Sequence, residues 1–340
     1  MHTWLGLLKI LGFTFLSLFL LVAIFFIYFN LPGPAPREDV HLGMTFSHRY
    51  ATDLGLDWQA TYGALLDEVG VKKMRLPVYW DLVEKNPGEY DWSVLDWEVN
   101  EAEKRGVELI LTLGQRVPRW PECHIPAWAN TKEALARQKA LRHFMTQTVK
   151  RYQGNPAVKT WQVENEPFLT FFGECPPLDV NFLEQEVALV KSLDPTRPVM
   201  LTDSGELSLW YRAAARGDAF GTTLYRKIYK GSIGYFTYPI GPNFFRFKAA
   251  LVRLLTHQEH FSVIELQAEP WANGWVGSVP LEEQYITMNP DLLGENVDYA
   301  RQVGFQDIYL WGGEWWYWLK EKKESPAVWE RAKELYQKYP

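Results

Sequence analysis

Short apolar runs alternate with longer amphipathic segments along most of this 340-residue chain, from about residue 41 onward. Such alternation is typical of parallel strands that are each followed by a helix packed against the sheet. The apolar runs lie at 42–47, 73–78, 107–113, 157–166, 198–202, 218–225, 261–265 and 307–311. Eight strand–helix units in about 300 residues predict one closed (β/α)8 barrel, the TIM barrel fold.

The segments between these runs carry helix-end signals. Gly106 follows the amphipathic segment 93–105, and glycine is common just past the last residue of a helix. Thr131 precedes the segment 132–152 and is expected to cap it. A longer excursion, 226–243, separates the sixth run from the next helix.

The first thirty residues differ in composition from the rest of the chain. Residues 10–29 form an apolar run of the length that a helix needs to cross a bilayer. Lys9 precedes the run, which predicts a cytoplasmic N-terminus and an extracytoplasmic body. We expect residues 1–30 to form a membrane anchor, 31–40 a Pro-rich stalk and 41–340 the barrel domain. An uncleaved signal anchor is favoured over a cleaved signal peptide, because the run is long and no Ala-x-Ala site follows it.

The two cysteines are Cys123 and Cys175, and each lies in a Pro-rich loop shortly after a predicted strand. Disulfides persist outside the cytoplasm. If the two strands are neighbours, their loops meet at the same end of the sheet. The sequence therefore predicts a Cys123–Cys175 disulfide; the alternative is two reduced cysteines packed separately.

Composition narrows the classes of partner. The net charge is −6 and no long basic run occurs, so nucleic acid is not an expected partner. The seven histidines show no metal-ligand spacing, and neither a phosphate-binding glycine loop nor a serine nucleophile elbow is present. We expect no cofactor and no metal. Aromatic residues make up 15% of the chain, which fits either an aromatic-rich core or a cleft whose flat rings stack on sugars.

Polar and aromatic side chains stand where the predicted strands end. A (β/α)8 barrel carries its functional groups at that face. Pro167 lacks the N–H that a sheet ladder needs, and it is expected to end the fourth strand with Glu166 as its last residue. The residues expected at this face are His48, Arg75, Gln115, Trp120, Asn165, Glu166, Asp203, Glu206, Tyr225, Glu265 and Trp311.

Asn165-Glu166-Pro167 on strand 4, with Arg75 on strand 2, Tyr225 on strand 6, a glutamate on strand 7 and Trp311 on strand 8, resembles clan A of the glycoside hydrolases. The run 80–92 is similar to the segment after strand 2 in cellulase-like and β-galactosidase-like members. The similarity covers about residues 41–320, and no motif selects one family within the clan.

The resemblance implies a retaining double displacement on β-linked sugars by two carboxylates. Glu166 would be the general acid/base, and Asn165 would bind the sugar 2-hydroxyl. Tyr225 would hydrogen-bond the nucleophile, Arg75 would keep that carboxylate ionised, and Trp311 would form the floor of the glycone subsite.

Two glutamates compete for the role of nucleophile, because Glu265 and Glu269 have the same strand parity. We predict Glu265, at the expected depth in a short strand, with Glu269 as the runner-up. Glu164 is a further inward-facing acid. The candidate sugar contacts, each of which could instead be a loop-packing residue, are His48, Gln115, Trp120, Trp271, Trp275, Tyr235 and Trp315.

Together these features predict a single-pass, membrane-anchored, extracytoplasmic glycosidase that hydrolyses oligo- or polysaccharides with retention. Two alternatives stay open from the sequence. One is a catalytically silent carbohydrate-binding barrel. The other is a transglycosylase that remodels surface glycans with the same residues.

Overall fold

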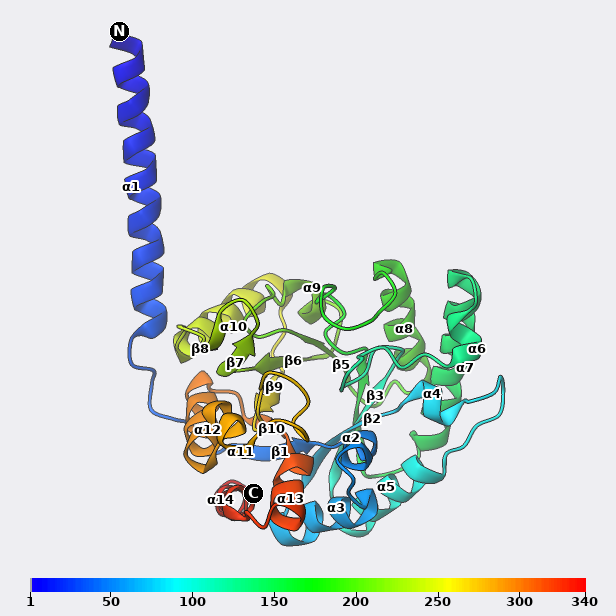
Figure 1. Cartoon of the computed structure of the whole chain (residues 1–340). Coiled ribbons are helices and arrows are strands. Elements are labelled where there is room, and N and C mark those ends of the chain that lie inside the picture. The colour runs from blue at the N-terminus through cyan, green and yellow to red at the C-terminus, as the bar shows by residue number, and fades with distance from the viewer. Residues whose placement is uncertain (1) are drawn as a thin grey trace.

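Eight parallel strands close into a barrel in the computed structural model, which describes residues 2–340 (Figure 1). Around the barrel the strand order is β1-β10-β9-β6-β5-β4-β3-β2. The strands are β1 (His41–Thr45), β2 (Lys73–Pro77), β3 (Glu108–Leu113), β4 (Val158–Val163), β5 (Val199–Asp203), β6 (Ala219–Leu224), β9 (Phe261–Gln267) and β10 (Asp307–Trp311). The predicted TIM barrel fold is confirmed.

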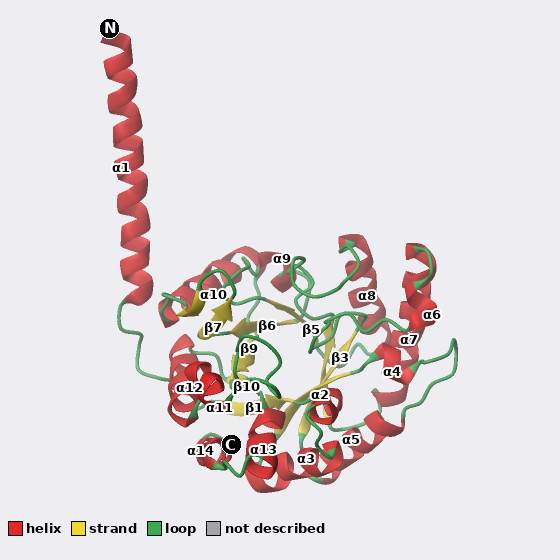
Figure 2. Ribbon diagram, viewed as in Figure 1, coloured by secondary structure: helices red, strands yellow, loops and turns green. Residues whose placement is uncertain are grey.

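Helices surround the barrel on its outer side (Figure 2). They are α2 (His48–Asp53), α3 (Trp58–Ala64), the π-helix Leu65–Val69, α4 (Trp80–Val83), α5 (Ser93–Lys104), α6 (Ala127–Asn130), α7 (Ala134–Tyr152), α8 (Val180–Leu193), α9 (Tyr211–Ala214), α10 (Pro242–Thr256), α11 (Leu281–Thr287), α12 (Pro290–Val303), α13 (Gly313–Lys322) and α14 (Ala327–Lys338). The expected stop at Gly106 is present, since this residue adopts φ +66 directly after Arg105, the C-cap of α5.

The structure corrects one local expectation and adds detail to another. Thr131 does not cap α7, which begins at Ala134; its hydroxyl donates to the carbonyl oxygen of Trp128 (3.2 Å) and closes the preceding helix α6. The excursion 226–243 contains an antiparallel hairpin, β7 (Lys227–Lys230) and β8 (Gly234–Thr237).

The fourth strand ends earlier than predicted, at Val163 rather than at Glu166. Glu164 and Glu166 adopt φ values of +55 and +43, in the left-handed region that side chains rarely enter. The backbone N–H of Glu166 donates to the side-chain hydroxyl of Thr202 on the neighbouring strand β5 (2.9 Å) instead of to a backbone carbonyl of the sheet. The chain therefore leaves the sheet at Glu164, before Pro167 can act.

Two layers of apolar side chains stabilise the barrel. The larger one lies between the strands and the helices and includes fully buried tryptophans such as Trp80, Trp161 and Trp316. A smaller cluster consists of strand residues alone, Ile110, Met200, Ala219, Ile264 and Tyr309, and we assign it to the barrel interior. Above it the interior becomes polar, with Thr45, Arg75 and Gln162 fully buried.

Helix α1 (His2–Asn30) projects away from the barrel (Figure 1). Its stretch from residue 10 to residue 30 is long and apolar enough to cross a bilayer, and it is exposed. Within residues 2–340 it is the one helix with this property. The connecting segment from residue 31 to residue 40 has no regular secondary structure, which fits its proline content.

Candidate active site

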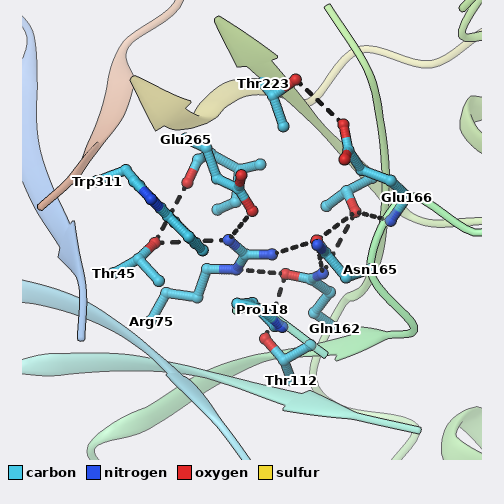
Figure 3. Close-up of polar contacts among 12 residues, drawn as sticks. Thr45, Arg75, Thr112, Pro118, Gln162, Asn165, Glu166, Thr223, Glu265 and Trp311 are labelled. Atoms are coloured by element: carbon cyan, nitrogen blue, oxygen red, sulfur yellow. Dashed lines mark hydrogen bonds and ion pairs between the residues drawn. The ribbon is translucent and has the colours of Figure 1, made fainter. Parts of the chain in front are cut away.

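Arg75 on β2 lies at the centre of a hydrogen-bonded network at the mouth of the barrel (Figure 3). Its Nη1 donates to Glu265 Oε1 (2.7 Å), and its Nη2 donates to Asn165 Oδ1 (2.7 Å). Its Nε donates to Gln162 Oε1 (2.8 Å). Because the guanidinium is planar and rigid, these three bonds fix the orientation of side chains from β4, β9 and the segment after β4.

Glu265 is buried and accepts hydrogen bonds on both carboxylate oxygens. Arg75 donates to Oε1, and the hydroxyl of Tyr225 donates to Oε2 (3.1 Å). Two donors, one of them a cation, hold the carboxylate in one orientation. Glu265 is thus rigidly oriented at the mouth, as a nucleophile would be.

Glu166 is also buried, but its surroundings favour the protonated form. Burial raises the pKa of its carboxyl well above the ordinary value, and repulsion from Glu265, Glu122 and Asp203 raises that pKa further. The hydroxyl of Thr223 donates to Glu166 Oε1 (3.1 Å). Glu166 is therefore suited to give up a proton at neutral pH and to take it back.

The contacts of Glu269 differ from those of Glu265. Its carboxylate forms an ion pair with Arg119 and accepts a hydrogen bond from the indole nitrogen of Trp311 (2.7 Å). Arg119 also donates to Glu314 Oε2 (3.0 Å). The charge of Glu269 is thus balanced by Arg119. Glu269 makes no hydrogen bond or ion pair with Arg75, whereas Glu265 is part of the Arg75 network.

Aromatic rings form a continuous row that starts at Tyr225, the tyrosine hydrogen-bonded to Glu265. Tyr225 meets Trp271 edge-on, with ring centroids 5.1 Å apart. Trp271 packs on Phe172 (6.1 Å), and Phe172 on Trp120 (6.0 Å). Trp120 is largely exposed. The structure therefore brings Trp120 and Trp271 to the same side of the mouth, with Phe172, which the sequence did not single out, between them.

Two other expected sugar contacts, His48 and Gln115, are outside the Arg75 network. His48 faces the helix layer, where its Nδ1 lies 3.2 Å from Glu98 Oε1 on α5 and its ring packs against Trp58 and Tyr79. Gln115 contributes its backbone N–H, which donates to Glu164 Oε1 (3.0 Å). Neither side chain joins the Arg75 network.

Glu164 holds the end of strand β4 against the loop after β3. Its carboxylate accepts the backbone N–H groups of Gln115 and Arg116 (2.6 Å for the latter), and burial raises its pKa to about 7. Gly114, at φ +128, leaves room for this carboxylate, since a Cβ there would lie 2.5 Å from it. Glu164 thus positions the Asn165–Glu166 segment.

Glu122 is a third buried carboxyl at the mouth, and sequence reasoning missed it. It accepts a hydrogen bond from Asn165 Nδ2 (3.1 Å), and the nearest cation, Arg116, lies 3.9 Å away. Burial raises the pKa of Glu122 to about 7. Its position in the loop Pro-Glu-Cys-His carries no periodic signal, so only the tertiary contact with Asn165 reveals it.

The predicted disulfide is confirmed: Cys123 and Cys175 are bonded, with Cα atoms 5.2 Å apart. It joins the loop after β3 to the loop after β4, and these two strands are paired neighbours. The bridge therefore ties the loop that carries Glu122 to the loop that follows Glu166. Among the described residues no group of three or more histidine, cysteine, aspartate or glutamate side chains is arranged to hold a metal ion.

Sequence comparison finds relatives named as mannan-degrading enzymes. The chain is 28% identical over 187 residues to the probable mannan endo-1,4-beta-mannosidase A of Aspergillus oryzae. It is 27% identical over 209 residues to the mannan endo-1,4-beta-mannosidase F of Aspergillus fumigatus. The alignments cover 50% and 57% of this chain but only 45% and 41% of these relatives, so the chain spans less than half the length of the curated relatives it matches. No family model matches the chain.

Solved structures share the fold at low identity. A GH5_18 protein from Bifidobacterium longum subsp. longum, solved in complex with Manb1-4GlcNAc, superposes with a TM-score of 0.60 at 12% identity. That match covers 88% of this chain and 78% of the other. A β-galactosidase from Halorubrum lacusprofundi gives a TM-score of 0.55 at 14% identity, over 80% of this chain and 52% of the other. With the sequence relatives, these findings confirm the resemblance to clan A of the glycoside hydrolases.

Proposed function

We propose that this chain is a membrane-anchored, retaining glycoside hydrolase that cleaves β-glycosidic bonds in oligo- or polysaccharides outside the cytoplasm. The names of the sequence relatives make β-1,4-linked mannose-containing glycans the first substrate class to test. The proposal rests mainly on one observation, the opposite surroundings of the two buried glutamates. Glu265 accepts hydrogen bonds from a cation and a phenol, whereas burial and neighbouring acids raise the pKa of Glu166.

In the first step a Glu265 carboxylate oxygen attacks the anomeric carbon while Glu166 gives its proton to the glycosidic oxygen. The carbon–oxygen bond to the leaving sugar breaks as the bond to Glu265 forms. In the second step Glu166 takes a proton from water, and the resulting hydroxide oxygen attacks the anomeric carbon. Glu265 leaves as a carboxylate, so the product keeps its β configuration.

The surrounding residues hold these groups in place. Arg75 and Tyr225 keep the Glu265 carboxylate oriented for attack. Asn165 is fixed through Oδ1 by Arg75, which leaves Nδ2, now shared with Glu122, to donate to the sugar 2-hydroxyl. The indole of Trp311 is anchored by Glu269, which suits a rigid stacking floor for the sugar ring.

The test uses the full-length chain in detergent with β-1,4-mannan, manno-oligosaccharides and aryl β-mannosides, β-galactosides and β-glucosides. We expect the wild type to cleave at least one of these substrates. Glu166→Gln and Glu265→Gln should lose that hydrolysis. NMR of the first product should show the β anomer. An α anomer as first product would refute retention.

The same experiment separates the two alternatives. Binding of a glycan by the wild type without any cleavage would favour a silent carbohydrate-binding barrel. Transfer of the glycosyl group to added sugar in preference to water would favour a transglycosylase.

The membrane and compartment assignments have separate support. The apolar helix α1 has the length of a membrane span, and the Cys123–Cys175 disulfide is typical of proteins outside the reducing cytoplasm. Protease added to the outside of intact cells should digest the barrel and leave the N-terminal segment with the membrane. A barrel that resists digestion until the cells are opened would contradict this orientation.

A further inference from the structure

We propose that helix α10 lies on the surface of the bilayer that α1 enters, so that the barrel rests on the lipid along one side. This inference depends on the proposed anchor but not on the proposed chemistry. Its starting point is that α10 is apolar on two faces. Phe245, Ala249 and Val252 face the barrel and are buried.

The second apolar face of α10 points outward. It consists of Phe247, Leu251, Leu254 and Leu255, at the three- and four-residue spacing of one helix face. All four are exposed, and Leu254 is 74% exposed. We call these four residues the outer stripe. Contiguous exposed apolar surface of this kind marks a contact with a partner or a membrane.

The outer stripe is continuous with the anchor. The ring of Phe247 lies 5.9 Å from Phe25 and 5.7 Å from Phe29, both in the last turns of α1, and Phe29 also packs edge-on against Phe244 (5.3 Å). Figure 1 shows α10 beginning beside the foot of α1 and following the side of the barrel from which α1 projects. The stripe therefore begins where the membrane span ends, which identifies lipid as its occupant.

Hydrogen bonds hold this junction in one arrangement. Asn30 Nδ2 donates to the carbonyl oxygen of Pro239 (3.1 Å), and Asn243 Nδ2 donates to the carbonyl oxygen of Tyr28 (3.3 Å). A Cβ on Gly241 would lie 2.4 Å from the carbonyl oxygen of Phe29, so the two backbones approach closely. The foot of α1 is thus packed on the barrel, and the orientation of the barrel relative to the bilayer follows from it.

The charges of α10 suit a membrane surface. The helix contains Arg246, Lys248 and Arg253 and no acidic residue. Arg246 is exposed beside the stripe, Arg253 is half-buried with Glu259 3.6 Å away, and Lys248 is buried. An apolar helix face with an exposed arginine beside it and no acidic residue on the helix fits the boundary between headgroups and acyl chains, where anionic lipid favours basic residues.

This arrangement has a consequence for substrate access. In Figure 1 the barrel is seen end-on while α1 is seen from the side. With α10 on the lipid, the mouth of the barrel opens along the membrane surface, toward glycans that lie close to the bilayer.

The test measures lipid contact at single labelled positions of the full-length chain in vesicles of phosphatidylcholine and phosphatidylglycerol. Leu254→Cys reports on the outer stripe and Ser17→Cys on the anchor. Lys104→Cys is the matched control, because Lys104 has a similarly exposed side chain (67%) and lies on α5, on the opposite side of the barrel by strand order. Each variant carries an environment-sensitive fluorophore, and nitroxide-labelled lipid is the quencher.

We expect loss of fluorescence on adding nitroxide lipid at Leu254→Cys and Ser17→Cys but not at Lys104→Cys. Quenching at Ser17→Cys with none at Leu254→Cys would overturn the docking of α10 and leave the anchor intact. No quenching at either position would refute the anchor itself. One further outcome would assign the stripe to a second copy of the chain. In that case the Leu254→Cys label is shielded from water but not quenched by nitroxide lipid, and it becomes exposed to water when the protein is diluted to one chain per vesicle.

Discussion

Removing the hydroxyl of Tyr225 tests the mechanism with little disturbance to the fold. Tyr225→Phe keeps the ring and its edge-on contact with Trp271 and deletes only the hydrogen bond to Glu265 Oε2 (3.1 Å). That bond matters most when Glu265 leaves the glycosyl-enzyme, because negative charge then develops on its oxygens. We therefore expect the second step to slow more than the first.

The size of the effect follows from the type of bond. A hydrogen bond to a charged group contributes a net of about 1.5–3 kcal/mol, which corresponds to a rate loss of about 10- to 150-fold. Because the glycosyl-enzyme then accumulates, kcat and the apparent KM should fall together. Steady-state and burst kinetics with an aryl glycoside of good leaving group measure both.

Tyr152→Phe is the matched control. It removes a tyrosine–carboxylate hydrogen bond of similar length, to Asp96 Oδ1 (2.8 Å), on the outer side of the barrel. This variant should change the melting temperature but not kcat. If folded Tyr225→Phe keeps the kcat of the wild type, Glu265 is not the residue on which charge develops, and the assignment of the nucleophile fails.

Three further predictions concern other parts of the site. Glu265→Gln should lower kcat by about 10⁴-fold or more, as loss of a nucleophile does. Glu269→Gln should instead lower kcat by no more than about 100-fold and mainly raise KM. Equal losses of kcat for the two variants in steady-state assays would contradict this. Gly114→Ala places a Cβ 2.5 Å from the Glu164 carboxyl at φ +128, so the free energy of unfolding from denaturant titration should fall by about 1–3 kcal/mol; an unchanged value would refute that clash. Folding raises the pKa of Glu122 from 4.5 to about 7, so this group stabilises the fold below pH 4.5 and its contribution is lost as the pH rises through 7. The loss amounts to up to about 3 kcal/mol. The free energy of unfolding should therefore be lower at pH 8 than at pH 5, and Glu122→Gln should diminish that difference.

The sequence alone determined the barrel and the centre of its site. Strand and helix periodicities are local, so the eight repeats could be counted without contacts, and the end of the last predicted strand matches β10 at Trp311. Barrel geometry placed Arg75 and a strand-7 glutamate at one face, because all barrel strands end there, and the resemblance to clan A implied that the two pair. The disulfide followed from the same geometry, since the loops after neighbouring strands meet.

Only the tertiary structure decided which strand-7 glutamate belongs to the network. Glu265 and Glu269 have the same parity, so alternation along the strand cannot separate them. The difference comes from Arg119, in the loop after β3, which pairs with Glu269 and leaves Glu265 to Arg75. A contact between loops far apart in sequence leaves no trace in either local pattern.

The same reason explains what else the sequence did not reveal. Glu122 reaches Asn165 through a loop whose path the disulfide constrains, and the outer stripe of α10 follows the same helical period as its buried face. Periodicity reports that a face is apolar but not what covers it. For α10 that answer came from the position of α1, whose last turns lie against Phe247.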